Sequence, residues 1–228
     1  MKLNTVVFDL DGTLVDPAPD LMHATYAILT AHGRRAVSLG ELREMVGRGA
    51  RMLIDQGFRL TGDPIEGDRL DPLYQDFVEH YSANIAIDSK PYPGVIELME
   101  ACQAQGLTLA VCTNKLEVLS IRLIEELGLS HYFACIIGPD TIGIAKPDPA
   151  PLREAVQRSG GTMDRAIMVG DSETDIRTAK AAAVPAIGVS FGYTDKHVST
   201  FEPEHVIDHF DEAWGILQGD YDIPLVRA

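Results

Sequence analysis

Carboxylates are the side chains of this sequence with the clearest capacity for chemistry, and they come in two short motifs. Asp9 and Asp11 stand two residues apart in FDLDGTLVD, and Asp171 and Asp175 stand four apart in GDSETD. Carboxylate oxygens, water and substrate phosphate are the ligands that Mg²⁺ prefers. If the two motifs meet in space, the sequence predicts a magnesium site.

Three further polar residues extend this predicted site. Thr113 and Asn114 end one apolar run, and Lys146 lies in AKPDPAP, beyond another. Ligands bind open parallel sheets at the carboxyl ends of the strands. Because each motif follows an apolar run, we expect the carboxylates, the hydroxyl and the lysine to converge at one edge of a sheet.

Apolar runs alternating with helical patterns predict the elements that position these residues. Continuous apolar runs are typical of strands buried on both faces. They lie at Thr5–Leu10, Leu107–Thr113, Ala134–Gly138, Ala166–Gly170 and Ala186–Ser190. Helical spacing of apolar residues occurs at Gly94–Gln105, Lys115–Leu127, Pro149–Ser159 and Glu173–Ala183. The alternation predicts an α/β fold with a doubly wound parallel sheet.

Residues 17–84 interrupt the alternation, because they carry helical patterns without a strand pattern. We interpret them as an inserted all-helical domain and assign 1–16 and 85–228 to the main domain. Ser38 followed by Glu41 predicts a capping box that opens one inserted helix. The segment SKPYPG at 89–94 is typical of a linker and returns the chain to the main domain.

Composition excludes several classes of protein. The 228 residues are 46% hydrophobic and 23% charged, with a formal net charge of −15. Such a charge repels nucleic acid and anionic membrane surfaces, so neither is an expected partner. No apolar run is long enough to span a membrane, and the amino-terminal segment lacks the pattern of a signal peptide. The three cysteines form no C-x-x-C pair, which favours a cytoplasmic location.

Four segments, FDLDGTLVDPAPDL, CTNK, AKPDPAPL and MVGDSETDIRTAKAAAVPAIGVSFGY, occur in an order that resembles the haloacid dehalogenase superfamily. The resemblance is to its phosphoglycolate phosphatase-like branch, which has a helical cap inserted after the first motif. It implies a Rossmann-like core and a Mg²⁺-dependent phosphomonoester hydrolase that acts on a small phosphorylated metabolite. 2-Phosphoglycolate is one candidate substrate, and the protein is expected to be a monomer or homodimer.

The resemblance also implies roles for the motif residues. Asp9 is the expected nucleophile, which forms an aspartyl-phosphate, and Asp11 the expected general acid and then general base. The expected metal ligands are Asp9, the main-chain carbonyl of Asp11, and Asp171. Asp175 is expected to support the metal site without binding the ion, or to act as an alternative ligand. Phosphate oxygens are expected to be held by Thr113, Asn114 and Lys146.

Two residues admit more than one interpretation. Arg48 lies between glycines in the inserted domain, where phosphoglycolate-specific relatives often have Asn. One interpretation is that Arg48 binds a carboxylate of the substrate. The other is that Arg48 is a solvated cation of a loop, with no role in binding. Ser172 suggests a nucleophilic serine, but its surroundings lack the nucleophile-elbow pattern and a helix N-cap is favoured.

Two alternative functions remain open. A phosphoryl-transfer mutase of the β-phosphoglucomutase type would share Asp9 and Asp11, but its aspartyl-phosphate would persist until a sugar rebinds. A non-enzymatic phospho-acceptor module of the receiver type has a similar cluster of Asp, Thr and Lys. Receivers are single compact domains, so the helical insert counts against this alternative.

Overall fold

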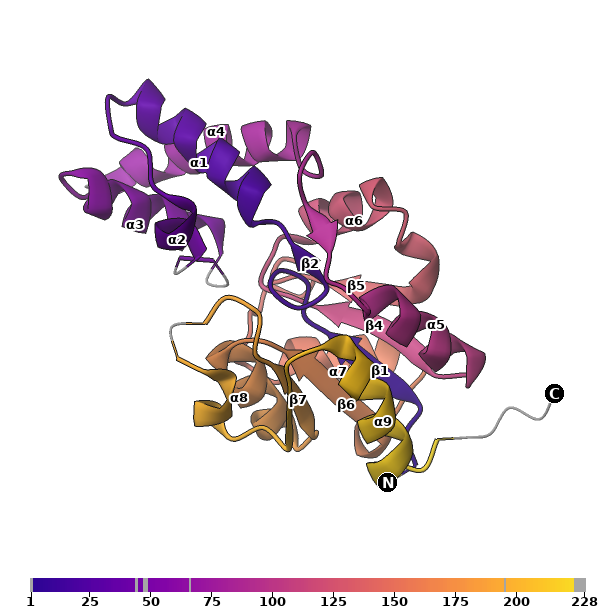
Figure 1. Ribbon diagram of the computed structural model, residues 1–228. Coiled ribbons are helices and arrows are strands. Elements are labelled where there is room, and N and C mark those ends of the chain that lie inside the picture. Colours follow the sequence, from indigo (N-terminus) through magenta and orange to yellow (C-terminus); the bar gives the residue numbers. More distant parts are fainter. Residues whose placement is uncertain (1, 44, 47–48, 66, 195, 224–228) are drawn as a thin grey trace.

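The computed structural model describes residues 2–43, 45–46, 49–65, 67–194 and 196–223. Its centre is a six-stranded sheet in the order β5-β4-β1-β6-β7-β8, in which every neighbouring pair is parallel (Figure 1). The strands are β1 Thr5–Phe8, β4 Thr108–Cys112, β5 Phe133–Ile137, β6 Ala166–Gly170, β7 Ala186–Val189 and β8 His205–Ile207. The predicted doubly wound α/β fold is thereby confirmed.

Helices cover both faces of the sheet, which explains why the strands are apolar on both sides. Alternate residues of a strand point to opposite faces. In β1, Val6 and Phe8 pack in one apolar cluster and Val7 in another. The first cluster includes residues of α5 (Val95–Ala104), α6 (Glu117–Glu126) and α9 (Phe210–Asp220). The second includes residues of α7 (Ala150–Arg158) and α8 (Glu173–Ala182).

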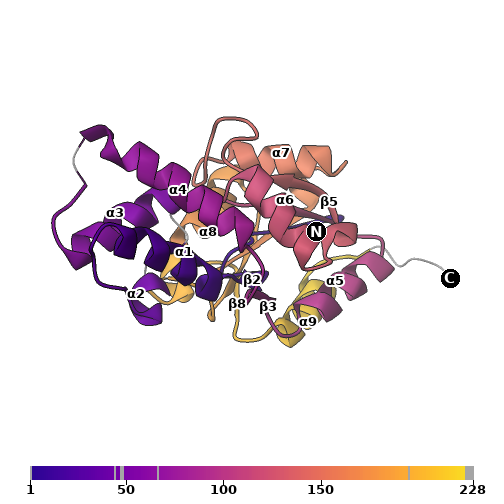
Figure 2. The same ribbon diagram turned by 90° about the horizontal axis from the view of Figure 1, so that it is seen from above.

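The described part of the segment between β2 and β3 contains four α-helices, which form a layer beside the sheet (Figures 1 and 2). They are α1 Ala18–Ala31, α2 Leu39–Arg43, α3 Ala50–Thr61 and α4 Leu70–Ala83. Their buried apolar residues, among them Leu29, Phe58 and Phe77, pack against one another. The predicted capping box opens α2, since the Ser38 amide donates to Glu41 Oε2 at 2.7 Å and the Glu41 amide donates to Ser38 Oγ at 3.2 Å.

The chain enters and leaves these helices through two short antiparallel strands, β2 Val15–Asp16 and β3 Lys90–Pro91. Asp20, at the start of α1, holds the returning chain. Its buried carboxylate accepts hydrogen bonds from the amides of Asp88 and Ser89 and from the Ser89 hydroxyl at 2.6 Å. The two segments that connect the inserted helices to the main domain are therefore hydrogen-bonded to each other. We call this pair of segments the crossing.

The structure adds elements that the sequence patterns did not predict: strands β2, β3 and β8, and helix α9. Single 3₁₀ turns also occur at Gly67–Arg69, Ser130–Tyr132, Met163–Arg165 and Val198–Phe201. Within the described ranges, none of the helices combines the length and the apolar character needed to cross a membrane.

Candidate active site

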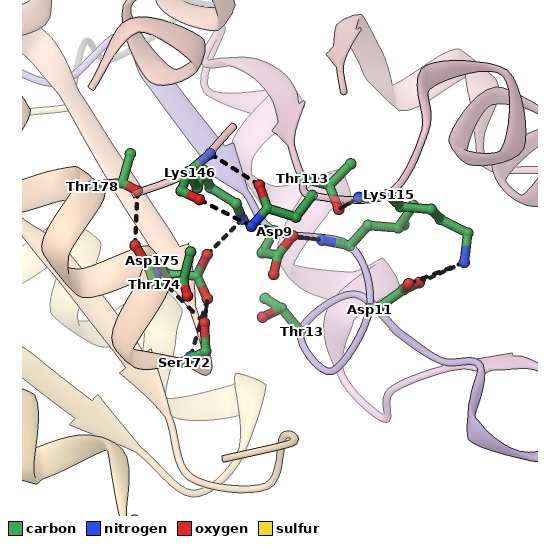
Figure 3. A network of polar contacts seen from close by, with 12 residues as sticks. Asp9, Asp11, Thr13, Thr113, Lys115, Lys146, Ser172, Thr174, Asp175 and Thr178 are labelled. Carbon is green, nitrogen blue, oxygen red and sulfur yellow. Dashed lines mark hydrogen bonds and ion pairs between the residues drawn. The ribbon is translucent and has the colours of Figure 1, made fainter. Parts of the chain in front are cut away.

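Lys146 is the centre of the polar cluster at the carboxyl end of the sheet. Its ammonium nitrogen lies 2.9 Å from Asp9 Oδ1 and 2.6 Å from Asp175 Oδ1 (Figure 3). All three side chains are almost completely buried. The structure thus brings together Asp9 and Lys146, from loops that follow β1 and β5, and Asp175, from the first turn of the helix α8 that follows β6.

Asp171 lies in the same cluster and is held by two donors. The Thr13 hydroxyl donates to Asp171 Oδ1 at 3.0 Å, and the main-chain amide of Tyr193 donates to Oδ2 at 2.7 Å. Two glycines leave room for this carboxylate. A Cβ on Gly12 would lie 2.6 Å from Asp171 Oδ2, and a Cβ on Gly192 would lie 2.2 Å from Asp171 Cβ. A side chain larger than hydrogen at either position would force the loop or the carboxylate to move.

Asp175 joins the cluster to the start of α8. Ser172 is the N-cap residue, as the sequence favoured, and its hydroxyl donates to Asp175 Oδ2 at 2.6 Å. The Ser172 amide donates to the same oxygen at 3.0 Å, while Oδ1 faces Lys146. Both oxygens of Asp175 are therefore engaged by the protein, so its place in the capping box fixes the position of the Lys146 ammonium.

The negative charge of this cluster exceeds its positive charge. Oxygens of Asp9, Asp171 and Asp175 lie within 4.8 Å of one another, and Lys146 is, among the described residues, the one cation whose ammonium forms ion pairs with two of them. Burial, followed by repulsion from Asp175, raises the pKa of Asp9 from 3.8 to about 7, although Lys146 opposes the shift. Burial, with repulsion from Asp175 and Asp9, also raises the pKa of Asp171 well above 3.8. A set of hard oxygen donors with uncompensated charge is the environment that a divalent cation fits.

Thr113 and Asn114 follow β4 and lie beside the cluster. The buried Thr113 hydroxyl accepts a hydrogen bond from the Lys115 amide at 3.2 Å. The Asn114 side chain binds the backbone of Lys146 in both directions, with its Nδ2 donating to the carbonyl at 3.1 Å and its Oδ1 accepting from the amide at 2.9 Å. The Asn114 side chain therefore anchors the loop that carries Lys146.

The side chain of Asp11 takes a different direction. It points away from Asp9 and toward Lys115, whose ammonium lies 3.1 and 3.0 Å from its two oxygens (Figure 3). Lys115 also donates to the hydroxyl of Tyr81 on α4 at 2.7 Å. Sequence reasoning assigned no role to Lys115 or Tyr81. The CTNK segment contained the lysine, but its partner on α4 is 34 residues away in the chain.

A cavity of about 450 Å³ lies between the α1–α4 helices and the ends of the strands. Asp9, Asp11 and Lys146 line one side of it, and Tyr74 and Arg51 line the other. The Arg51 guanidinium stacks on the Tyr74 ring, 4.4 Å from the ring centroid. Arg48, the predicted specificity residue, lies outside the described residues, so its position stays untested.

The chain matches a known family along most of its length. Residues 6–189 match the family model of the haloacid dehalogenase-like hydrolases. The crystal structure of a predicted phosphoglycolate phosphatase from Haemophilus somnus is similar with a TM-score of 0.89 and 28% identity, covering 96% of this chain and 99% of that one.

Two curated relatives have established names. A phosphoglycolate phosphatase of Mesorhizobium japonicum is 48% identical over 211 residues, which are 92% of this chain and 93% of the relative. An N-acetylmuramic acid 6-phosphate phosphatase of Pseudomonas aeruginosa is 33% identical over 219 residues, which are 95% of this chain and 96% of the relative. Both names describe phosphatases.

Proposed function

The chain belongs to the haloacid dehalogenase-like hydrolases and is a phosphatase of their phosphoglycolate phosphatase-like branch, and we propose that it hydrolyses a small phosphate monoester through an aspartyl-phosphate at Asp9. The observation that carries the proposal is the buried cluster of Asp9, Asp171, Asp175 and Lys146 beside the cavity. Such a cluster can hold a phosphate next to a carboxylate nucleophile, because cations offset the repulsion between them.

Mg²⁺ is the cofactor that we propose for this cluster. Asp9, Asp171 and the main-chain carbonyl of Asp11 would hold it, and Asp175, which is bound by Ser172 and paired with Lys146, would support the site without binding the ion. When bound, the ion would screen the charge between the nucleophile and the phosphate. The raised pKa values of Asp9 and Asp171 support the proposal, because burial and then the neighbouring carboxylates disfavour the charged forms, and a bound cation would offset both effects.

The reaction divides into two displacements. In the first, an oxygen of Asp9 bonds to phosphorus, the ester bond breaks, and Asp11 gives its proton to the leaving oxygen. In the second, Asp11 takes a proton from water, the water oxygen bonds to phosphorus, and the bond from phosphorus to Asp9 breaks. Inorganic phosphate leaves and both aspartates return to their initial states. Lys146 and Thr113 would bind the phosphate oxygens during both steps, and Asn114 would keep Lys146 in place.

The mutase alternative shares this first displacement and differs in what accepts the phosphoryl group. The curated names of both relatives favour water as the acceptor, because each describes a phosphatase.

We propose that the substrate carries a carboxylate as well as a phosphate. The compounds in the names of the two relatives, phosphoglycolate and N-acetylmuramic acid 6-phosphate, have both groups. The cavity of about 450 Å³ has room for a small metabolite, and the higher identity of the first relative favours 2-phosphoglycolate.

The test is a measurement of phosphate release from a panel of phosphorylated metabolites, with Mg²⁺ and with a chelator. We expect a carboxylate-bearing monoester to give the highest kcat/KM, activity only with metal, and loss of turnover in Asp9→Asn. Turnover that survives in Asp9→Asn would contradict the nucleophile assignment, and isomerisation of a sugar phosphate without net phosphate release would support the mutase instead.

A further inference from the structure

Lys115 lies between Asp11, the predicted general acid, and the inserted helices α1–α4. Its side chain is 6% exposed, and its ammonium contacts both oxygens of Asp11 and the hydroxyl of Tyr81. The ammonium also lies 4.5 Å from the centroid of the Tyr81 ring. Asp11 and Lys115 belong to loops after β1 and β4, whereas Tyr81 belongs to α4. One side chain thus joins the catalytic edge of the sheet to the inserted helices.

Counting donors separates the role of Lys115 from that of Lys146. An ammonium group has three N–H donors. Those of Lys115 have three acceptors in this arrangement, namely the two oxygens of Asp11 and the hydroxyl of Tyr81. A substrate oxygen could bind Lys115 only by displacing one of them. Lys115 is therefore better placed to hold Asp11 than to hold phosphate.

The direction in which Asp11 is held matches the chemistry proposed for it. In an in-line displacement the leaving oxygen lies on the side of phosphorus opposite to the nucleophile. An acid that protonates this oxygen must lie on the far side of the phosphate from Asp9, and the Asp11 side chain extends away from Asp9 (Figure 3). Asp11 also lines the cavity together with Asp9. When Asp11 carries its proton, one oxygen can keep the contact with Lys115 while the other presents the proton.

Tyr81 is a rigid support for the lysine. It is 1% exposed, and its ring stacks on Phe77 with a centroid separation of 5.9 Å. Both aromatic residues belong to α4 and line the cavity. The position of the Lys115 ammonium is therefore tied to the position of α4.

We propose that Lys115 is a positioning residue for Asp11 and that Tyr81, by holding Lys115, makes the alignment of the general acid depend on the placement of α4. The inference rests on the proposed function, because it assumes that Asp11 transfers the proton. It assigns to the inserted helices a role in the chemical step in addition to enclosing the substrate.

The matched pair of variants is Tyr81→Phe and Ser82→Ala. Phe keeps the stacked ring and removes only the hydroxyl that binds Lys115. Ser82 is the next residue of α4, and its hydroxyl accepts a hydrogen bond at 2.9 Å from Arg122 of α6, away from the residues that line the cavity. Each variant deletes one hydrogen bond between α4 and the main domain, but only the bond lost in Tyr81→Phe lies next to Asp11.

The readout is kcat/KM on two substrates, the alkyl phosphate hydrolysed fastest in the panel and p-nitrophenyl phosphate. This parameter reports the steps up to departure of the leaving group. Alkoxides are poor leaving groups and need protonation, whereas p-nitrophenolate does not. We expect Tyr81→Phe to lower kcat/KM about tenfold on the alkyl phosphate and less than about twofold on p-nitrophenyl phosphate. Ser82→Ala should change neither.

A double variant tests whether Tyr81 acts through Lys115. Lys115→Met should reproduce the selective loss, and adding Tyr81→Phe to Lys115→Met should cause little further loss, since the shared partner is gone. Thermal melting of each variant shows that it is folded. Equal losses on the two substrates, or a Tyr81→Phe that behaves like Ser82→Ala, would overturn the inference. Asp11→Asn separates the inference from the proposed function. If Asp11→Asn lowers kcat/KM on the alkyl phosphate but the Lys115 and Tyr81 variants do not, the proposed function stands and the inference fails. If Asp11→Asn keeps the wild-type kcat/KM, the proposed function and the inference both fail.

Discussion

At the residue scale, the buried carboxylates should make the stability of the metal-free protein depend on pH. The pKa of Asp9 is raised to about 7 by burial and by Asp175, against the opposing effect of Lys146. Because the raised value belongs to the folded state, the folded chain binds this proton more tightly than the unfolded chain does. The contribution of Asp9 to the free energy of unfolding is therefore greatest below about pH 4 and is lost as the pH rises through about 7.

The measurement is the melting temperature in chelator from pH 5 to pH 8 for the wild type and Asp9→Asn. Asn cannot titrate, so we expect the melting temperature of the variant to increase relative to that of the wild type as the pH rises. Asp63→Asn, at an exposed position, serves as the control and should follow the wild type. Mg²⁺ should raise the melting temperature of the wild type at pH 8 and should raise that of Asp9→Asn less. A melting difference that does not change with pH would contradict the assignment of the shift to Asp9.

How far the site could be predicted depends on the kind of group that each contact uses. Asp9, Thr113 and Asp171 could be found because each is a polar side chain that directly follows an apolar run. The main-chain amide that holds Asp171 belongs to Tyr193 and has no signature in the sequence, because every residue except proline has one. Lys115 carried a visible charge, but its function depends on a partner in another element.

At the element scale, two capping boxes provide an internal comparison. Ser172 caps α8 and binds Asp175, whereas Ser38 caps α2 at an exposed position. Loss of either cap should lower the free energy of unfolding by about 1 kcal/mol. Only Ser172→Ala should also lower kcat/KM, roughly tenfold, because it removes one of the two donors that hold the carboxylate facing Lys146.

Urea unfolding and steady-state kinetics on both variants test this expectation. Ser38→Ala is the control for a cap far from the chemistry and should retain full activity. Equal activity of the two variants would mean that the position of Lys146 does not depend on the cap of α8.

The loop after β7 makes a steric demand of the same kind. A Cβ on Gly192 would approach Asp171 Cβ to 2.2 Å, so Gly192→Ala must move either the loop or the carboxylate. We expect at least a tenfold higher Mg²⁺ concentration for half-maximal activity in this variant. Gly215→Ala in α9 is the control, because a Cβ there would have no neighbour within 4 Å, and it should raise stability by up to about 1 kcal/mol. An unchanged Mg²⁺ requirement in Gly192→Ala would show that the loop yields instead.

Element length decided which strands the sequence could predict. The five predicted strands each have four or five residues in the structure, and their apolar runs are visible. β8 has only three residues, His205–Ile207, which is too short for a pattern to emerge. The two residues of β2 pair with β3 across more than seventy positions of the chain, a register that depends on how the inserted helices return the chain.

At the scale of the whole molecule, the cavity lies between the inserted helices and the ends of the strands. We propose that residues 17–84 act as a cap on the domain formed by 1–16 and 85–228. The crossing between them is stabilised by the buried carboxylate of Asp20, which accepts from the backbone and the hydroxyl of the returning segment. A change at this crossing should therefore affect both stability and substrate binding.

Asp20→Asn replaces one of the accepting oxygens with an NH₂ group. An NH₂ group cannot accept hydrogen bonds, so a backbone N–H donor that faces it would lose its partner. Hydrogen bonds to a charged group contribute about 1.5–3 kcal/mol, so we expect the free energy of unfolding to fall by about 2 kcal/mol. Because the cavity lies between the cap and the strand ends, KM should rise more than kcat falls. Asp88→Asn is a matched control at the same crossing, since its side chain is about half exposed and should change stability by less than about 0.5 kcal/mol. The contradicting outcome is an Asp20→Asn variant with the same melting temperature and the same kinetic constants as Asp88→Asn. In that case the β2–β3 pairing, rather than the buried carboxylate of Asp20, would hold the two connecting segments together and keep the cap in position.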